Sequence, residues 1–198
     1  MSDLSRLTFD SMTRLVRRGA DTYAELDLYV PTFERAFPVE IRISNGSSVV
    51  SDKTLQTVGE IASLPQEARA RVHTLLYEDA LRASTEVAFS DPNPPPEVPP
   101  SGFFRRIFWR PTRYRFVPLS LDDPRHPCCF VNGHQSVEAK IEWLRFRIDE
   151  DESLTHRFAL FDCRPAWEEE HGASVVFRDG VPVAVAEHDV GLAKYDGV

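Results

Sequence analysis

The sequence lacks the short motifs that identify many nucleotide-binding proteins and hydrolases. It contains no P-loop, no GxGxxG turn, no GxSxG nucleophile elbow and no HExxH zinc motif. A phosphate-binding glycine loop, an exposed serine nucleophile and a helical zinc site are therefore not indicated by any local pattern. An enzyme whose active site is assembled from distant residues stays compatible with the sequence.

Cysteine is scarce, and its spacing matches no disulfide or metal-binding framework. The chain has three cysteines, Cys128, Cys129 and Cys163, and no CxxC spacing. An odd number that includes an adjacent pair does not build the paired framework of a small secreted domain. We therefore predict free, buried thiols that pack as small apolar groups.

Long hydrophobic runs and an excess of positive charge are also missing. Residues 1–18 mix acidic, basic and polar side chains, and no later run approaches the roughly 20 apolar residues of a membrane span. The net charge is -8, whereas nucleic acids and anionic membranes attract clusters of lysine and arginine. We therefore predict a cytoplasmic protein that binds neither nucleic acid nor membrane, and for which a basic protein is the better-matched partner.

The length and composition favour a single domain. A chain of 198 residues that is 42% hydrophobic can close one substantial core, but two independent cores would be cramped. We divide the domain into N-terminal strands and a helix pair in residues 1–89, a proline-rich loop in residues 90–102 and a β-rich half in residues 103–198. The loop holds six prolines and is predicted to be an exposed spacer, with adaptor-like docking as a minor alternative.

Hydrophobic periodicity predicts two strands and two helices in the N-terminal half. Apolar residues alternate with polar ones in Thr22–Val30 and in Pro38–Ser44, as expected for half-buried antiparallel strands. Apolar residues recur at helical spacing in Ser51–Ala62, where Ser51 is the predicted N-cap, and again in a longer segment that ends near Ala88.

The C-terminal half is predicted to be mainly β. Strand-like runs occupy residues 106–110, 113–118, 138–148 and 156–162, separated by proline-containing and acidic turns. The clearest element is Ser174–Ala186, where Asp179 and Gly180 favour a two-residue type I′ turn that would set Val176 opposite Val183. Together these elements predict an α+β fold, in which a two-helix segment packs on a mainly antiparallel sheet.

The densest group of polar side chains directly precedes this hairpin. It consists of Trp167, Glu168, Glu169, Glu170, His171 and Gly172. In a structural interpretation, Trp167 fills the end of the core, His171 hydrogen-bonds to backbone, and Gly172 permits a conformation that a side chain forbids. In the alternative, a small hydrolase or metal-dependent enzyme uses His171, Glu170 and Cys163. The spacing matches no metal-binding pattern, so we predict no metal and no cofactor.

Two acidic runs are the predicted partner-binding residues. One is Asp149, Glu150, Asp151 and Glu152, and the other is Glu168, Glu169 and Glu170. Such runs are commonly solvated loops, but a basic partner protein would find complementary charge on them. Residues 103–110 interleave arginines with large aromatics and could stack bases, although a core strand with arginines facing water suits the negative net charge better.

The C-terminal residues resemble a known signature. The stretch from Trp167 to Gly172 is followed by Val175 to Gly180, by Val183 and by His188-Asp189. This pattern resembles a bacterial family of uncharacterised small domains that are often immunity proteins of polymorphic or contact-delivered toxins. The Leu-Pro-x-Glu-Ala-Arg sequence of the helix pair is similar too, whereas the proline-rich residues 90–102 depart from the family.

The resemblance covers about two thirds of the chain and implies a non-enzymatic antidote. Such a protein binds one cognate toxin and covers its active site or blocks its assembly. Many of these toxins act on nucleic acids through basic clefts, which an acidic inhibitor complements. Trp167, His171, Gly172, Asp179 and Gly180 would then shape the fold, while the acidic loops select the partner.

Overall fold

In the computed structural model, the fold of this protein is built around one mixed β-sheet. The structure describes residues 6–43, 49–86, 89, 119–121, 123–130, 133–168, 170–187 and 191–197. The proline-rich loop and the strands predicted at residues 106–110 and 113–118 lie outside the described residues.

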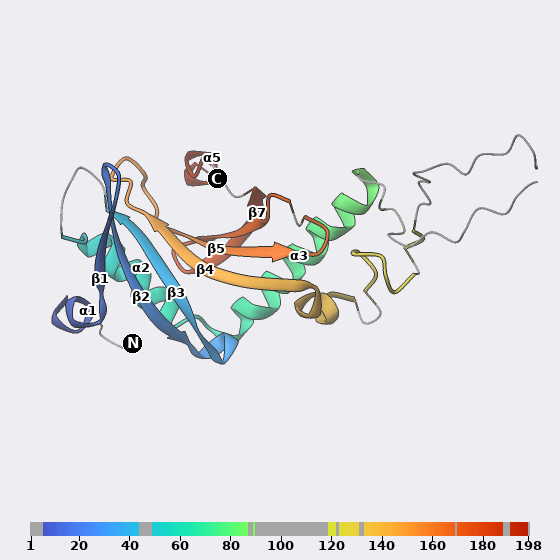
Figure 1. Ribbon diagram of the computed structural model, residues 1–198, viewed down its shortest axis with the longest axis horizontal. Helices are drawn as coiled ribbons and strands as arrows, with labels where there is room; N and C mark the ends of the chain where they lie inside the picture. The colour runs from blue at the N-terminus through green and yellow to red at the C-terminus, as the bar shows by residue number, and fades with distance from the viewer. Residues whose placement is uncertain are drawn as a thin grey trace, which may run out of the picture.

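Within the described residues, seven strands form the sheet, and their spatial order follows the chain. The strands are β1 Arg14–Arg18, β2 Asp21–Val30, β3 Arg35–Ile43, β4 Ile141–Asp149, β5 Phe158–Pro165, β6 Ala173–Arg178 and β7 Val181–Glu187. Neighbouring strands pair antiparallel, except that β3 and β4 pair in parallel. A parallel pair needs a long crossover, and the segment with the helix pair provides it (Figure 1).

Two helices cover one face of this sheet. They are α2 Asp52–Ala62 and α3 Gln66–Glu86, and Ser51 caps α2 by accepting a hydrogen bond from the Thr54 amide. The shorter elements are α1 Arg6–Met12, the 3₁₀ segments η1 Pro31–Phe33 and η2 Gly133–Lys140, and α5 Ala193–Asp196. The predicted α+β fold, with a helix pair on a mainly antiparallel sheet, is confirmed. None of the described helices is long and apolar enough to cross a membrane.

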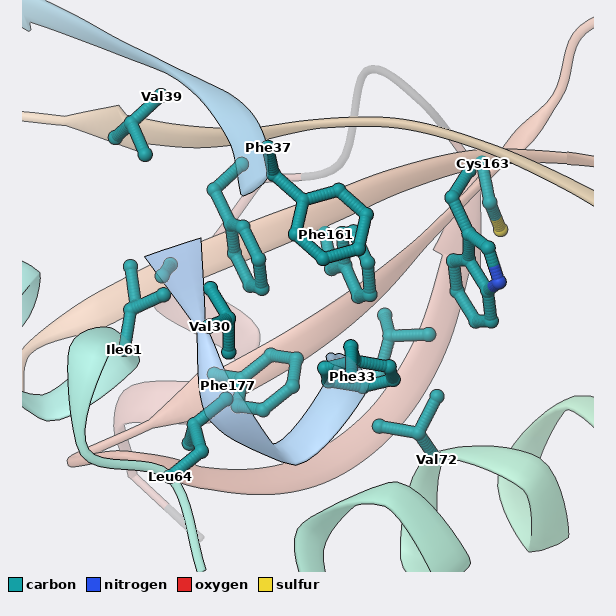
Figure 2. Close-up of a cluster of buried hydrophobic side chains, with 14 of the residues drawn as sticks. Val30, Phe33, Phe37, Val39, Ile61, Leu64, Val72, Phe161, Cys163 and Phe177 are labelled. Atoms are coloured by element: carbon teal, nitrogen blue, oxygen red, sulfur yellow. The ribbon is translucent and has the colours of Figure 1, made fainter. Parts of the chain in front are cut away.

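The main core lies between the sheet and the helix pair. Strand alternation builds this core: four alternate residues of β2 point inward and are buried, and they are Ala24, Leu26, Leu28 and Val30. Figure 2 shows Phe33, Phe37, Phe161 and Phe177 gathered close to Ile61 and Val72 of the helices. The Phe161 ring stacks on Phe146 with centroids 4.1 Å apart and meets Phe33 edge-on at 5.2 Å.

The C-terminal hairpin confirms the predicted turn but corrects its register. Both turn residues have positive φ, 49° at Asp179 and 77° at Gly180, as a type I′ turn requires. The pairing shifts by one residue near Pro182, so Val176 lies opposite Ala184 and the prediction of Val183 is wrong. This shift is a β-bulge, and it lies beside Pro182, which has no amide hydrogen to donate to the ladder. Because β7 is the strand at this edge of the described sheet, the bulge is tolerated there.

The start of strand β4 also differs from the prediction. The run predicted as a strand over residues 138–148 begins with Glu138–Lys140 in the 3₁₀ segment η2, and β4 starts at Ile141. Val137 of η2 is fully buried in the main core, so packing against the helix pair holds this segment in a helical turn.

Candidate interaction surface

The face of the sheet opposite α2 and α3 is only partly covered within the described residues. Leu192 and Tyr195, at α5, pack there against a small apolar cluster that includes Leu160 and Val176. Figure 1 shows α5 at the β5–β7 end of the sheet, apart from α2. We refer to the remainder of this face, over β1 to β5, as the open face.

A row of alternating charges crosses the open face. Arg18 Nη1 donates to Glu40 Oε2 at 2.6 Å, and Arg145 Nη1 lies 3.4 Å from the same oxygen. Arg145 Nε in turn contacts Asp162 Oδ2 at 3.3 Å, while Ser174 Oγ donates to the other Asp162 oxygen at 2.7 Å. The row therefore links β1, β3, β4, β5 and β6.

The carboxylates of this row are far more buried than its arginines. Asp162 is fully buried and Glu40 is 8% exposed, whereas the Arg18 side chain is 49% exposed. The hydrogen bond to Glu40 raises the pKa of Arg18 above its ordinary value. Buried carboxylates of this kind hold the guanidinium groups of the neighbouring arginines in fixed positions on the sheet.

Two hollows adjoin along the open face. The first has a volume of about 460 Å³ and is lined by Arg14, Arg18 and Glu40 among others. The second has a volume of about 560 Å³, and its lining includes Arg164 and His171. They share two lining residues, Pro38 and Arg145.

Trp167 anchors the signature stretch to the helix pair. Its side chain is 4% exposed, and its Nε1 donates to Asp79 Oδ2 on α3 at 2.9 Å. Its ring meets Phe130 edge-on at 5.8 Å. Trp167 therefore packs at the end of the core, as predicted, with its polar atom satisfied by a helix residue.

Gly172 and His171 have different surroundings. Gly172 has a φ of +70°, and a Cβ atom there would lie 3.0 Å from the carbonyl oxygen of Cys163. This position therefore requires glycine, as predicted. The side chain of His171 is 72% exposed, and its Nδ1 lies 3.2 Å from Glu168 Oε1, so the predicted bond to backbone is wrong.

The hairpin turn at Asp179 is tied to helix α2. Asp179 Oδ2 lies 2.6 Å from His156 Nδ1, and Oδ1 accepts from the Arg157 amide at 3.1 Å. Arg157 Nη2 also donates to Glu60 Oε1 of α2 at 2.6 Å. Burial is the largest single influence on Asp179 and opposes ionisation, but these hydrogen bonds together lower the pKa of Asp179 below its ordinary value.

The first acidic run is partly used to hold the fold. Glu150 Oε1 accepts a hydrogen bond from the Ser51 amide at 2.7 Å, directly before α2. Asp151 accepts a hydrogen bond from the Ser153 amide at 2.9 Å, and Asp149 is the last residue of β4. Asp151 and Glu152 are exposed, so part of the predicted acidic surface is available for a partner.

The second acidic run lies at the opposite end of the sheet. Glu168 is half-buried and Glu170 is exposed, while Glu169 lies outside the described residues. Ile141 at the start of β4 pairs with Pro165 at the end of β5, so the two runs flank β4 at its two ends. Nine strand residues separate them by about 25–30 Å. The acidic runs are therefore two sites rather than one patch.

The cysteines are free thiols, and two of them are buried. Burial raises the pKa of Cys163 well above its ordinary value and that of Cys128 to about 11. Cys129 is half-buried. In the described part of the chain, no group of three His, Cys, Asp or Glu residues is placed to hold a metal ion.

Comparison with known proteins gives no match. No protein-family model, no curated protein and no solved structure matches this chain.

Proposed function

We propose that this protein is an immunity-type inhibitor that binds a cognate bacterial toxin in the cytosol and neutralises it. The observation that carries the proposal is the placement of exposed carboxylates, Glu152 at one end of the sheet and Glu170 at the other. A toxin that reaches both ends of the sheet would meet Glu170 at the hollow beside His171 and Glu152 beside the start of α2. The rigid sheet between them gives a preorganised binding surface.

The positions of the signature residues support this proposal. Trp167 donates a hydrogen bond to Asp79, the backbone at Gly172 has no room for a Cβ atom beside Cys163, and the Asp179 turn bonds to His156 and Arg157. These side chains are used to build the fold. The loops are then the parts that contact a partner, as the family resemblance implies.

Charge supports a basic partner. The net charge of -8 attracts a basic protein at long range and raises the rate of encounter. Arg18 and Arg145 of the open face are paired with the buried carboxylates of Glu40 and Asp162. Glu152 and Glu170 of the acidic loops are exposed and supply the negative charge that a basic partner would meet.

The test begins with affinity capture from lysate of the source organism at low ionic strength, followed by mass spectrometry. The captured protein is then expressed alone and together with this chain, and growth is measured. We expect growth arrest in the first case and rescue in the second. A captured protein whose expression leaves growth unchanged contradicts the proposal.

Matched charge reversals then test the acidic loops. We expect Glu152→Lys combined with Glu170→Lys to lower the association rate with the captured toxin by about tenfold at low salt. Glu67→Lys combined with Glu78→Lys makes the same change in net charge on exposed sites of α3 and should lower the rate far less. Equal effects of the two pairs would show that only net charge matters, and that these loops are not the contact.

The hollow beside His171 favours a second candidate, a small hydrolase. His171, Glu170, Arg145 and Arg164 all line this space of about 560 Å³. The Cys163 thiol would have to ionise against its raised pKa, which counts against a thiolate role. Hydrolysis of a panel of ester and phosphoester substrates that is abolished by His171→Ala would favour the enzyme over the inhibitor.

A further inference from the structure

We propose that the outer edge of β1 binds an acidic, extended segment of another protein by adding a strand to the sheet. This surface is separate from the acidic loops, and the inference does not depend on the proposed toxin. Its basis is the hydrogen-bonding pattern of β1, its charge and the exposed apolar side chains beside it.

The backbone of β1 has one side without a strand partner among the described residues. Within this part of the chain β1 pairs only with β2, and Arg18 pairs with Asp21 across the two-residue turn at Gly19. Gly19 has a φ of +65°, which fits the first central position of a type II′ turn. In such a hairpin the closing pair is hydrogen-bonded and the pattern alternates, so the main-chain groups of Leu15 and Arg17 point away from β2.

The charge of this edge is opposite to that of the whole molecule. Three of the five residues of β1 are arginines, Arg14, Arg17 and Arg18, and all three are exposed, while the net charge of the chain is -8. Arg18 is held by Glu40, and Arg14 lines the same hollow of about 460 Å³. Arg14 and Arg18 lie on one face of β1 and Arg17 on the other. Glutamate or aspartate side chains at alternate positions of an added strand would therefore lie beside Arg14 and Arg18.

Apolar side chains complete the recognition surface. Leu15 is 53% exposed and lies on the opposite face of β1 from Arg14. Met12, which is 47% exposed, also lines the hollow beside Arg14. An added strand that alternates acidic and aliphatic residues would therefore place its acids by Arg14 and Arg18 and its aliphatic side chains by Leu15, which shares its face with Arg17.

A second copy of this chain is the poorer occupant of the same edge. Antiparallel pairing of all five β1 residues with a second copy puts Arg14 opposite Arg18 on one face. Like charges directly opposite each other on paired strands are destabilising. The arginines therefore select against self-association and in favour of an acidic strand.

The experiment uses the full chain and two synthetic peptides. The probe is a fluorescent seven-residue peptide of alternating glutamate and valine, and the matched control has lysine in place of glutamate. Binding is measured by fluorescence anisotropy, and the amides of Leu15 and Arg17 are followed by NMR. We expect the acidic peptide to bind at least about tenfold more tightly than the basic one and to shift both amide signals.

Two substitutions at one position separate strand addition from simple charge attraction. Leu15→Pro removes an amide that faces away from β2, so the β1–β2 pairing is retained, but an added strand loses a hydrogen bond and meets the ring. Leu15→Ala keeps the amide and is the matched control. We expect Leu15→Pro to weaken peptide binding at least about tenfold and Leu15→Ala to weaken it far less.

The remaining outcomes also decide the matter. Equal binding of both peptides, or unchanged binding by Leu15→Pro, overturns the proposal. If Leu15→Pro disrupts β1, Arg14→Glu combined with Arg17→Glu keeps the backbone and must reverse the peptide preference. A concentration-dependent dimer in sedimentation that Leu15→Pro abolishes would replace the acidic strand with a second copy.

Discussion

Gly172→Ala should destabilise the protein for two reasons that can be measured separately. The first is the left-handed backbone: φ is +70° at Gly172, and an alanine there costs about 1–2 kcal/mol, part of which is offset by the loss of freedom in the unfolded chain. The second is contact: the new Cβ would lie 3.0 Å from the Cys163 carbonyl oxygen. This oxygen belongs to the backbone of β5, so relief requires movement of the sheet, at about 1 kcal/mol or more.

Gly133→Ala is the matched control, because it carries only the first of these effects. Gly133 has a similar φ of +59°, and nothing lies within 4 Å of an added Cβ atom. We expect a loss of about 2–3 kcal/mol for Gly172→Ala and less than about 1 kcal/mol for Gly133→Ala. With a urea m-value of about 2 kcal/mol/M, the midpoint should fall by about 1 M or more in the first case and by less than about 0.5 M in the second. Equal shifts in the two variants would refute the reasoning, because the contact with β5 would then contribute nothing.

Three other predictions concern buried groups. Asp162→Ala removes the fully buried one of the two carboxylates beside Arg145 and should lower the free energy of unfolding by about 3 kcal/mol, with a smaller loss for Asp162→Asn, in urea denaturation. The pKa of Asp179 is lower in the folded protein than in the unfolded chain. The ionised Asp179 carboxylate therefore stabilises the fold fully above the unfolded pKa of about 3.9, and this stabilisation is lost as the pH falls through the pKa of the folded state. Wild type should therefore lose more stability than Asp179→Asn between about pH 5 and about pH 2, and parallel curves would contradict this. Thiol labelling under native conditions should modify Cys129 first, whereas Cys128 and Cys163 should react only on unfolding; immediate labelling of all three would contradict their burial.

Local patterns in the sequence predicted the helix pair, β2, β3 and the C-terminal hairpin. Each has a signal within a few residues, such as the Ser51 cap or the Asp179 turn. Strand β1 was missed because its two apolar residues, Leu15 and Val16, are adjacent and show no alternation. The 3₁₀ form of Glu138–Lys140 was missed because packing on α3 decides it.

The row of charges on the open face could not be found in the sequence. Glu40 and Arg145 are 105 residues apart, and they meet only because β3 and β4 are neighbours in the sheet. Alternation alone did place Glu40 on the polar face of its strand. The burial of Asp162 had no such signal, since β5 is buried on both faces over most of its length.

The parallel pairing of β3 with β4 divides the folding of the sheet into local and long-range steps. Strands β1 to β3 form one antiparallel group and strands β4 to β7 form another, and each group can form from residues that are near in the chain. The parallel pairing of β3 with β4, which we call the seam, joins four residue pairs from distant parts of the chain. Non-local pairing of this kind is slow, because the loop must close before its contacts form. The seam is therefore the expected rate-limiting event. Since the entropy of closure rises only with the logarithm of loop length, evolution can lengthen or shorten the crossover with little change in that rate.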